Sequence, residues 1–145
     1  MRLTICSSAS FVHESQEIKK KLVKKGVEAL LYPETVKVKG KTMTVDEFYT
    51  KRKKNLTEEF LETKKQLIDE HIEKIKNSDA VLILNFDKSK IRGYVGGNTF
   101  MEMGVAYALG KKIFIWKKPS NTLPYYEEIM AMRPTMIEEN LEKIE

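Results

Sequence analysis

The stretch GYVGGNTFMEMG, residues 93–104, decides how the rest of the chain is interpreted. It follows an apolar run, Ala80 to Leu84, that is typical of a buried strand, and it leads into a run, Phe100 to Leu109, that is typical of a helix. Glycines at such a turn let the backbone bend sharply and approach a ligand closely. The following helix directs its free N–H groups and the positive end of its dipole toward the turn. The stretch therefore predicts a ligand site beside one acid, Glu102.

Strands and helices alternate on both sides of this stretch. Apolar runs predict strands at Leu3 to Cys6, Glu28 to Tyr32, Ala80 to Leu84, Lys112 to Trp116 and, at an edge, Thr135 to Ile137. Helical spacing predicts helices at Val12 to Lys25, Asp46 to Lys76, Phe100 to Leu109 and Tyr125 to Met132, and Glu34 to Thr44 is expected to be a flexible loop. The alternation predicts an α/β fold with a parallel sheet and right-handed crossovers. If the first and third strands are neighbours, the turns at Ser7 to Phe11 and Asn85 to Thr99 face each other.

Composition limits the class of protein. The 145 residues are expected to form one domain, and 41% hydrophobic and 32% charged residues fit a globular protein. No apolar run approaches the roughly 20 residues that span a bilayer, and the N-terminus lacks a signal-peptide pattern. The single cysteine, Cys6, suits a reducing cytoplasm, where we expect the protein. One cysteine and two histidines are too few for a typical zinc cage, so no metal or cofactor is expected.

The basic residues concentrate in one region. The net charge is +5, and the excess gathers at Lys37, Lys39, Lys41, Lys51, Arg52, Lys53 and Lys54. A positive protein favours phosphate-bearing ligands without identifying them. The segment is interpreted as a solvated connector and helix face, and nucleic-acid binding is ranked last because few aromatic residues lie between the lysines.

Glu102 is the first candidate for chemistry. At the mouth of the sheet it is a candidate nucleophile or acid–base group. The alternative is a capping box, in which Thr99 caps the helix and Glu102 binds back to the cap's N–H. Local sequence favours the cap, but a plain capping box does not need the glycines that precede it.

Small polar residues after the first strand form the second candidate. Ser7, Ser8 and Ser10 open a helix and suit phosphate or sugar oxygens, although a serine-rich helix cap explains them equally well. Gly97, Asn98 and Thr99 are expected to complete the pocket from the other turn.

His71 is expected to approach Glu102. Eight residues of helix separate His71 from Asp79 and rise about 12 Å, while the five-residue strand that follows rises about 16 Å. The helix therefore brings His71 most of the way back to the edge of the sheet where Glu102 is expected. The alternative is a partly exposed helix histidine, which local sequence favours because no partner is in view. Asp87 is a candidate for a sugar hydroxyl or for backbone donors in its turn. Phe11, Tyr49 and Tyr94 are candidates for base stacking, although packing onto the core is the default for aromatic residues. Cys6 is expected to be a buried strand thiol.

The pattern resembles the nucleoside 2-deoxyribosyltransferase family, including its deoxynucleoside 5′-monophosphate N-glycosidase branch. The resemblance covers Ser7 to Phe11 and Ile75 to Ile115, and its core is NSDAVLIL at 77–84, NTFMEMG at 98–104 and AYALGKK at 106–112. It implies a flavodoxin-like or Rossmann-like doubly wound parallel sheet of four to five strands, with a long helix after a basic insertion at residues 34–54 that is a loop or lid. It also implies a homodimer or higher oligomer. The chain departs from the family at His71, near a position usually held by an aspartate, and at Gly96, roughly where the transferases carry another.

The resemblance implies that Glu102 attacks the anomeric carbon of a deoxyribosyl group and that the sugar then passes to water or another base. The expected function is an N-glycosidase or deoxyribosyltransferase acting on a nucleoside or nucleotide, with His71 orienting Glu102 or moving a proton. Hydrolysis is preferred because of the positive charge and the missing second carboxylate. The alternative is a non-catalytic nucleotide-binding sensor with the same fold.

Overall fold

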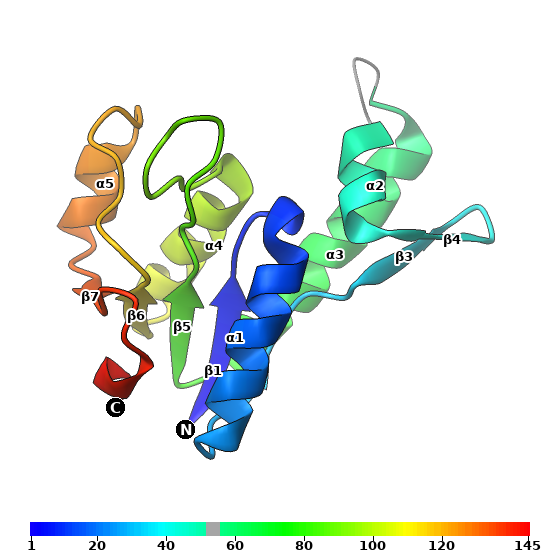
Figure 1. The fold of residues 1–145 in the computed structure, drawn as a ribbon. Coiled ribbons are helices and arrows are strands. Elements are labelled where there is room, and N and C mark those ends of the chain that lie inside the picture. Colours follow the sequence, from blue (N-terminus) through cyan, green and yellow to red (C-terminus); the bar gives the residue numbers. More distant parts are fainter. Residues whose placement is uncertain (52–55) are drawn as a thin grey trace.

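The centre of the molecule is a five-stranded, fully parallel sheet (Figure 1). The computed structural model describes residues 1–51 and 56–145. The strands, in their order across the sheet, are β2 (Glu28–Leu30), β1 (Arg2–Cys6), β5 (Ala80–Ile83), β6 (Lys112–Ile115) and β7 (Thr135–Met136). Counted along the chain within this sheet, the order is 2-1-3-4-5, the doubly wound order of flavodoxin-like folds. The predicted α/β class and the neighbouring first and third strands are confirmed.

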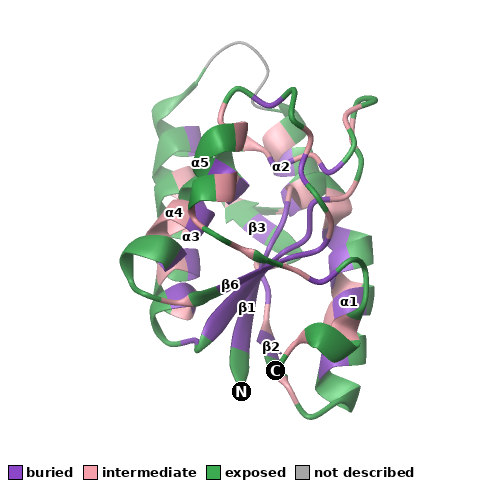
Figure 2. Cartoon of the chain, turned by 90° about the vertical axis from the view of Figure 1, so that its left-hand side faces the viewer, coloured by how far each residue is buried: buried purple, intermediate pink, exposed green. Residues whose placement is uncertain are grey.

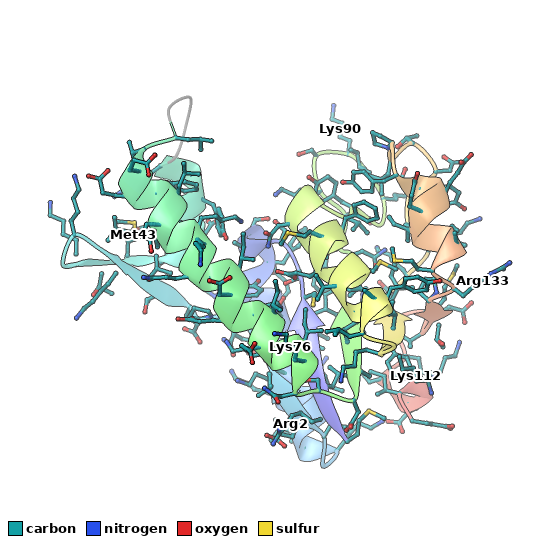
Figure 3. The ribbon with its side chains drawn as sticks, turned by 180° about the vertical axis from the view of Figure 1, so that it is seen from behind. Arg2, Met43, Lys76, Lys90, Lys112 and Arg133 are labelled. Atoms are coloured by element: carbon teal, nitrogen blue, oxygen red, sulfur yellow. The ribbon has the colours of Figure 1, made fainter. Side chains whose placement is uncertain are left out.

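Helices cover both faces of the sheet. One face carries α1 (Val12–Lys24), and the other carries α3 (Glu58–Lys76), α4 (Gly97–Ala108) and α5 (Tyr126–Ala131). Figure 3, seen from behind, shows α3 and α4 lying in front of the strands. A short 3₁₀ turn at Ala9–Phe11 precedes α1, and another lies near the C-terminus at Leu141–Lys143. The strands are buried between helices whose outer sides are exposed (Figure 2).

The alternation of side chains along β1 sorts its residues between the two faces. Leu3 and Ile5 pack with the residues of α1, whereas Cys6 packs with the residues of α3 and α4. Successive side chains of a strand point to opposite faces, so every second residue of β1 faces the α3 and α4 layer. The side chain of Cys6, the last residue of β1, therefore points toward α3 and α4 at the carboxyl edge of the sheet.

Residues 34–44 form a β-hairpin, so the predicted flexible loop is wrong. β3 (Thr35–Val38) pairs antiparallel with β4 (Lys41–Thr44). Between them Lys39 and Gly40 have φ of 50° and 75°. Two central residues with positive φ make the turn whose twist matches that of a two-stranded ribbon.

The predicted helix from Asp46 to Lys76 is two helices. α2 is described over Val45–Lys51, and residues 52–55, which include three of the predicted basic residues, lie outside the described residues. α3 starts after Thr57, whose hydroxyl accepts a hydrogen bond of 3.1 Å from the N–H of Phe60. The rings of Phe48 and Phe60 stack with centroids 4.6 Å apart, so the two helices pack on each other.

Among the described residues, no helix combines the length and the apolar character that crossing a bilayer requires.

Candidate functional site

The site lies at the carboxyl ends of β1 and β5, where the two following connections turn to opposite faces of the sheet. These strands are paired, with Cys6 opposite Ile83, and the N–H of Leu84 donates to the carbonyl of Cys6. From this edge β1 leads to α1 on one face and β5 leads to α4 on the other. Such a switch point leaves a crevice outside the carboxyl ends of the strands, where ligands bind in folds of this type.

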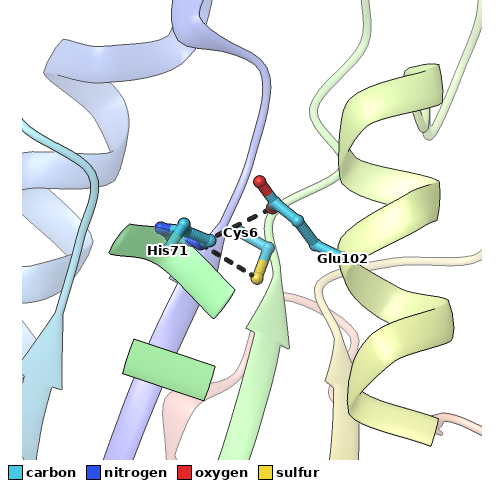
Figure 4. A group of neighbouring side chains, drawn as sticks. All are labelled: Cys6, His71 and Glu102. Carbon is cyan, nitrogen blue, oxygen red and sulfur yellow. Dashed lines mark hydrogen bonds and ion pairs between the residues drawn. The ribbon is translucent and has the colours of Figure 1, made fainter. Parts of the chain in front are cut away.

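Three side chains from three elements meet below this crevice (Figure 4). His71 Nε2 of α3 lies 3.5 Å from Cys6 Sγ of β1 and 3.5 Å from Glu102 Oε2 of α4. Cys6 is fully buried, and His71 and Glu102 are only 4% and 6% exposed. His71 is therefore not the partly exposed helix histidine of the alternative interpretation.

Glu102 does not cap its own helix, so the capping-box interpretation is wrong. α4 begins at Gly97, after a cap residue, Gly96, that makes no side-chain hydrogen bond. Its first backbone bond joins the N–H of Phe100 to the carbonyl of Gly96, so Thr99 already lies within the first turn. Glu102 instead accepts a hydrogen bond of 3.0 Å from Asn98 Nδ2.

Burial makes the three-residue cluster neutral at physiological pH. It raises the pKa of the Glu102 carboxyl to about 8, against the opposing effects of the Cys6 hydrogen bond, the Lys64 charge and the Asn98 hydrogen bond. Burial, followed by the charge of Lys74, lowers the pKa of His71 to about 4. Burial also raises the pKa of the Cys6 thiol well above its usual value. The contact between His71 and Glu102 therefore joins two neutral groups at pH 7 instead of an ion pair.

Two neighbouring cavities lie at this edge of the sheet, and the inner one borders the cluster. The inner one, of about 40 Å³, is bounded by Ser7, Tyr32, His71, Asn98 and Glu102, with an apolar wall from α2 and α3. The outer one, of about 620 Å³, is within the size range of small-molecule sites. Ser7 and Asn98 line both cavities, so the cluster lies at the inner end of a ligand-sized space.

Most of the residues predicted to bind substrate line the outer cavity. They are Ser7, Ser8, Ser10, Gly97, Asn98 and Thr99. Two predicted residues are placed elsewhere. Phe11 packs edge-to-face on Phe86, with ring centroids 5.2 Å apart. Asp87 accepts a hydrogen bond from the N–H of Gly93 and pairs with Lys117 at 2.8 Å, so it stabilises the turn.

Two lysines of the outer cavity were not predicted. Lys64 Nζ donates to Asn98 Oδ1 at 3.0 Å and to the hydroxyl of Tyr49 at 2.9 Å. Lys88 Nζ donates to Ser8 Oγ at 3.1 Å. Lys64 precedes His71 by seven residues, which is two helical turns and hence the same face of α3. That spacing was the signal available for Lys64, whereas Lys88 lies in a loop whose path the sequence does not define.

The insertion contributes to the cavity through α2. Asp46, Tyr49 and Thr50 line the outer cavity, and Val45 lines the inner one. Among the described residues, the predicted basic residues of the insertion lie elsewhere, and Lys39 pairs with Glu59 at 3.1 Å. The positive charge of the cavity therefore comes from α3 and from the loop after β5.

Comparisons with known proteins place these observations in a family. The sequence profile described as nucleoside 2-deoxyribosyltransferase matches residues 5–143. The fold is similar to a 2-deoxyribosyltransferase from the psychrotolerant bacterium Bacillus psychrosaccharolyticus, with a TM-score of 0.54 and 13% identity over 85% of this chain and 77% of that one. A 2-desoxiribosyltransferase from Leishmania mexicana gives a TM-score of 0.52 and 16% identity over 88% and 70%.

A third solved structure is less similar. The Clostridium botulinum CMP N-glycosidase BcmB gives a TM-score of 0.47 and 16% identity over 94% of this chain and 85% of that one. No curated protein matches the sequence significantly. At these identities the structural comparisons show the fold, and the profile match over nearly the whole chain shows the family.

Proposed function

Since the chain belongs to the nucleoside 2-deoxyribosyltransferase family, we propose that it cleaves the base–sugar bond of a nucleoside or nucleotide with Glu102 as the nucleophile. The observation that carries this proposal is the position of Glu102. Its carboxyl group is buried at the switch point of the sheet, borders the inner cavity and is held by Asn98 and His71. A carboxyl group that only stabilised the fold would not need to border a cavity that shares Ser7 and Asn98 with a ligand-sized one.

The first step forms a covalent intermediate. A Glu102 carboxylate oxygen bonds to the anomeric carbon, the bond from that carbon to the base nitrogen breaks, and its electron pair leaves with the base, which takes a proton from solvent. Only the ionised carboxylate performs this attack. Because the pKa of Glu102 is about 8, roughly a tenth of the protein is in the reactive form at pH 7.

In the second step a water oxygen attacks the same carbon, the sugar–Glu102 bond breaks and the carboxylate is released. His71 is the base available to take the water proton, because its imidazole is neutral at physiological pH. Before that, its Nε2 positions Glu102 from 3.5 Å away. We propose hydrolysis in preference to transfer, because the cluster contains no second carboxylate among the described residues.

A 5′-phosphate is the proposed anchor of the substrate. Lys88 Nζ and the hydroxyls of Ser8 and Ser10 form a connected group, with separations of 3.1 and 2.9 Å, on the wall of the outer cavity. The first N–H groups of α4, at Gly97 and Asn98, face the same cavity and favour an anion. Ser10 is exposed and Ser8 and Lys88 are partly exposed, so this group suits the end of the substrate that lies away from the buried Glu102.

Release of free base from nucleosides, deoxynucleosides and their 5′-monophosphates tests the proposal. We expect release at pH 8.5, a lower rate at pH 7, and loss of activity in Glu102→Gln but not in the exposed control Glu62→Gln. Lys88→Met should reduce the preference for monophosphates, and Lys90→Met in the same loop should not. If no substrate releases base at either pH, or if Glu102→Gln releases it at the wild-type rate, the proposal is wrong.

A competing function is nucleotide binding without turnover. The observation that favours it is the protonated state of Glu102 at neutral pH, which leaves few molecules able to attack. A nucleotide that stabilises the protein against thermal unfolding, with no base release at any pH and no effect of Glu102→Gln on binding, would select this function.

The oligomeric state and the location of the protein stay predictions. A homodimer or higher oligomer is expected from the resemblance, and two apolar side chains of α4, Met101 and Tyr107, are 37% and 58% exposed. Sedimentation equilibrium tests the assembly, and Tyr107→Glu tests whether Tyr107 takes part. Fractionation of cells tests the expected cytoplasmic location.

A further inference from the structure

The buried cluster has the geometry of a metal-ion site. The ligand atoms of Cys6, His71 and Glu102 all lie within 4.8 Å of one another, and two of their separations are 3.5 Å. Around a tetrahedral zinc ion, with Zn–S of about 2.3 Å and Zn–N and Zn–O of about 2.0–2.1 Å, neighbouring ligand atoms are roughly 3.3–3.6 Å apart. Two edges of the observed triangle already have that length.

The donor set selects the type of metal. A thiol, an imidazole and a carboxyl group together suit a borderline-soft ion such as Zn²⁺, whereas Mg²⁺ and Ca²⁺ require mostly oxygen ligands. The three donors come from β1, α3 and α4, and all are buried. Because packed elements hold them, a metal ion would find its ligands in place.

The fourth coordination position has room. The inner cavity of about 40 Å³ borders His71 and Glu102, and it is large enough for one water molecule. Three protein ligands and one open position are the arrangement of zinc sites that exchange a ligand. Asn98 holds Oε1 of Glu102, which leaves Oε2, the oxygen that faces His71, for the metal.

We propose that Cys6, His71 and Glu102 bind one Zn²⁺ ion, and that this ion reversibly inhibits the enzyme by occupying the nucleophile. On binding, the Cys6 thiol and the Glu102 carboxyl each lose a proton to solvent, and their two negative charges balance the charge of the ion. The occupied site thus carries no net charge, which limits the cost of holding an ion in a buried place. The inhibitory half rests on the proposed function, whereas binding itself does not.

The surroundings of His71 indicate an exchangeable site. Metal-bound histidines normally donate their second ring N–H to a carboxylate or carbonyl, and loss of such a partner weakens binding by about 10- to 100-fold. Within the described part of the chain, Nδ1 of His71 is buried without a hydrogen-bond partner. We therefore expect a chelator such as EDTA to remove the ion from the folded protein.

Cobalt binding to the full chain is the direct test. After treatment with EDTA and its removal, Co²⁺ should give the visible bands of tetrahedral cobalt and a near-ultraviolet thiolate-to-cobalt band. Cys6 is the single cysteine of the chain, so such a thiolate band can only come from this site. Titration calorimetry with Zn²⁺ should give one ion per chain.

Variants separate the site from adventitious binding. Cys6→Ser and Glu102→Gln should each weaken Zn²⁺ binding at least about tenfold, because each removes one of three ligands. His13→Gln, which changes the other, exposed histidine, should bind like the wild type. Circular dichroism verifies that each variant is folded, and either ligand variant alone suffices if the other fails to fold. A missing thiolate band, or wild-type Zn²⁺ affinity in the ligand variants, would overturn the proposal.

Activity measurements then test inhibition. Zn²⁺ should stop base release, and EDTA should restore it. Zinc binding to a protein without glycosidase activity would refute the proposed function and leave the metal site standing. Glycosidase activity in a protein that does not bind zinc would refute the metal site and leave the proposed function standing.

Discussion

Replacing Glu102 by glutamine should stabilise the protein while removing its proposed activity. Glutamine has nearly the same shape and can still accept the hydrogen bond from Asn98, but it has no charge to bury. The wild-type carboxyl group is 6% exposed and has a pKa of about 8. In the unfolded chain the same carboxyl group has its ordinary pKa of 4.5. Folding therefore opposes the ionisation of this one side chain.

The size of the effect follows from the two pKa values. Well below pH 4.5 the carboxyl group is protonated in both the folded and the unfolded protein, and its contribution to the free energy of unfolding is most favourable. As the pH rises toward 8, the unfolded chain loses the proton and the folded protein keeps it, so stability falls by up to about 1.4 kcal/mol per pH unit. Relative to a neutral side chain, the cost is on the order of 1 kcal/mol at pH 5 and 3 kcal/mol at pH 7.

Urea unfolding at pH 5, 6, 7 and 8 in the presence of EDTA measures this difference in metal-free protein. The free energy of unfolding of Glu102→Gln should exceed that of the wild type by an amount that grows by on the order of 2 kcal/mol between pH 5 and pH 7. The exposed control Glu62→Gln on α3 should follow the wild-type curve. If the curves of Glu102→Gln and the wild type are parallel, the carboxyl group is not held protonated by burial, and the reasoning about its charge fails.

Three further perturbations test the site and its support. Lys64→Met removes a positive charge that lowers the pKa of the buried carboxyl, so the rising limb of the pH–rate profile for base release, expected near pH 8, should move to higher pH. His71→Asn should lower kcat by on the order of 100-fold and change KM by about threefold or less, whereas His13→Asn should change neither in steady-state assays. Gly93→Ala should cost on the order of 3 kcal/mol in urea unfolding, because φ is 61° and the new methyl group would meet a backbone carbonyl. Gly97→Ala meets no atom within 4 Å and should cost less than about 1 kcal/mol.

The sheet was predictable from the sequence because its signals are local. Ala80 to Leu84 is apolar without interruption, as expected of a strand covered on both faces, and every residue of it is buried. The hairpin at 35–44 was missed because its lysines were interpreted as a solvated loop. The alternation of Val36 and Val38, followed by a Lys39–Gly40 turn, was the signal that identifies it.

The site was predictable only in part because it depends on contacts between elements. The rise of a helix and of a strand indicated that His71 lies toward the edge of the sheet where Glu102 is, since both lengths follow from residue counts. The contact of Cys6 with His71 depends on which side of α3 faces the sheet, and residue counts do not determine that rotation. Lys64 was missed for a related reason, because a lysine on a charged helix is interpreted as solvated unless the buried face of the helix is known.

The position of His71 depends on the crossover from α3 to β5. The N–H of Asp79 donates to the carbonyl of Arg2, and the hydroxyl of Ser78 lies 2.7 Å from that of Thr4, so the start of β5 is fixed against β1. Each residue of an α-helix turns its side chain by about 100°. One residue inserted between His71 and Ser78 would therefore rotate the imidazole away from Glu102 without changing the sheet. The length of this crossover, as much as the identity of the three side chains, assembles the buried cluster.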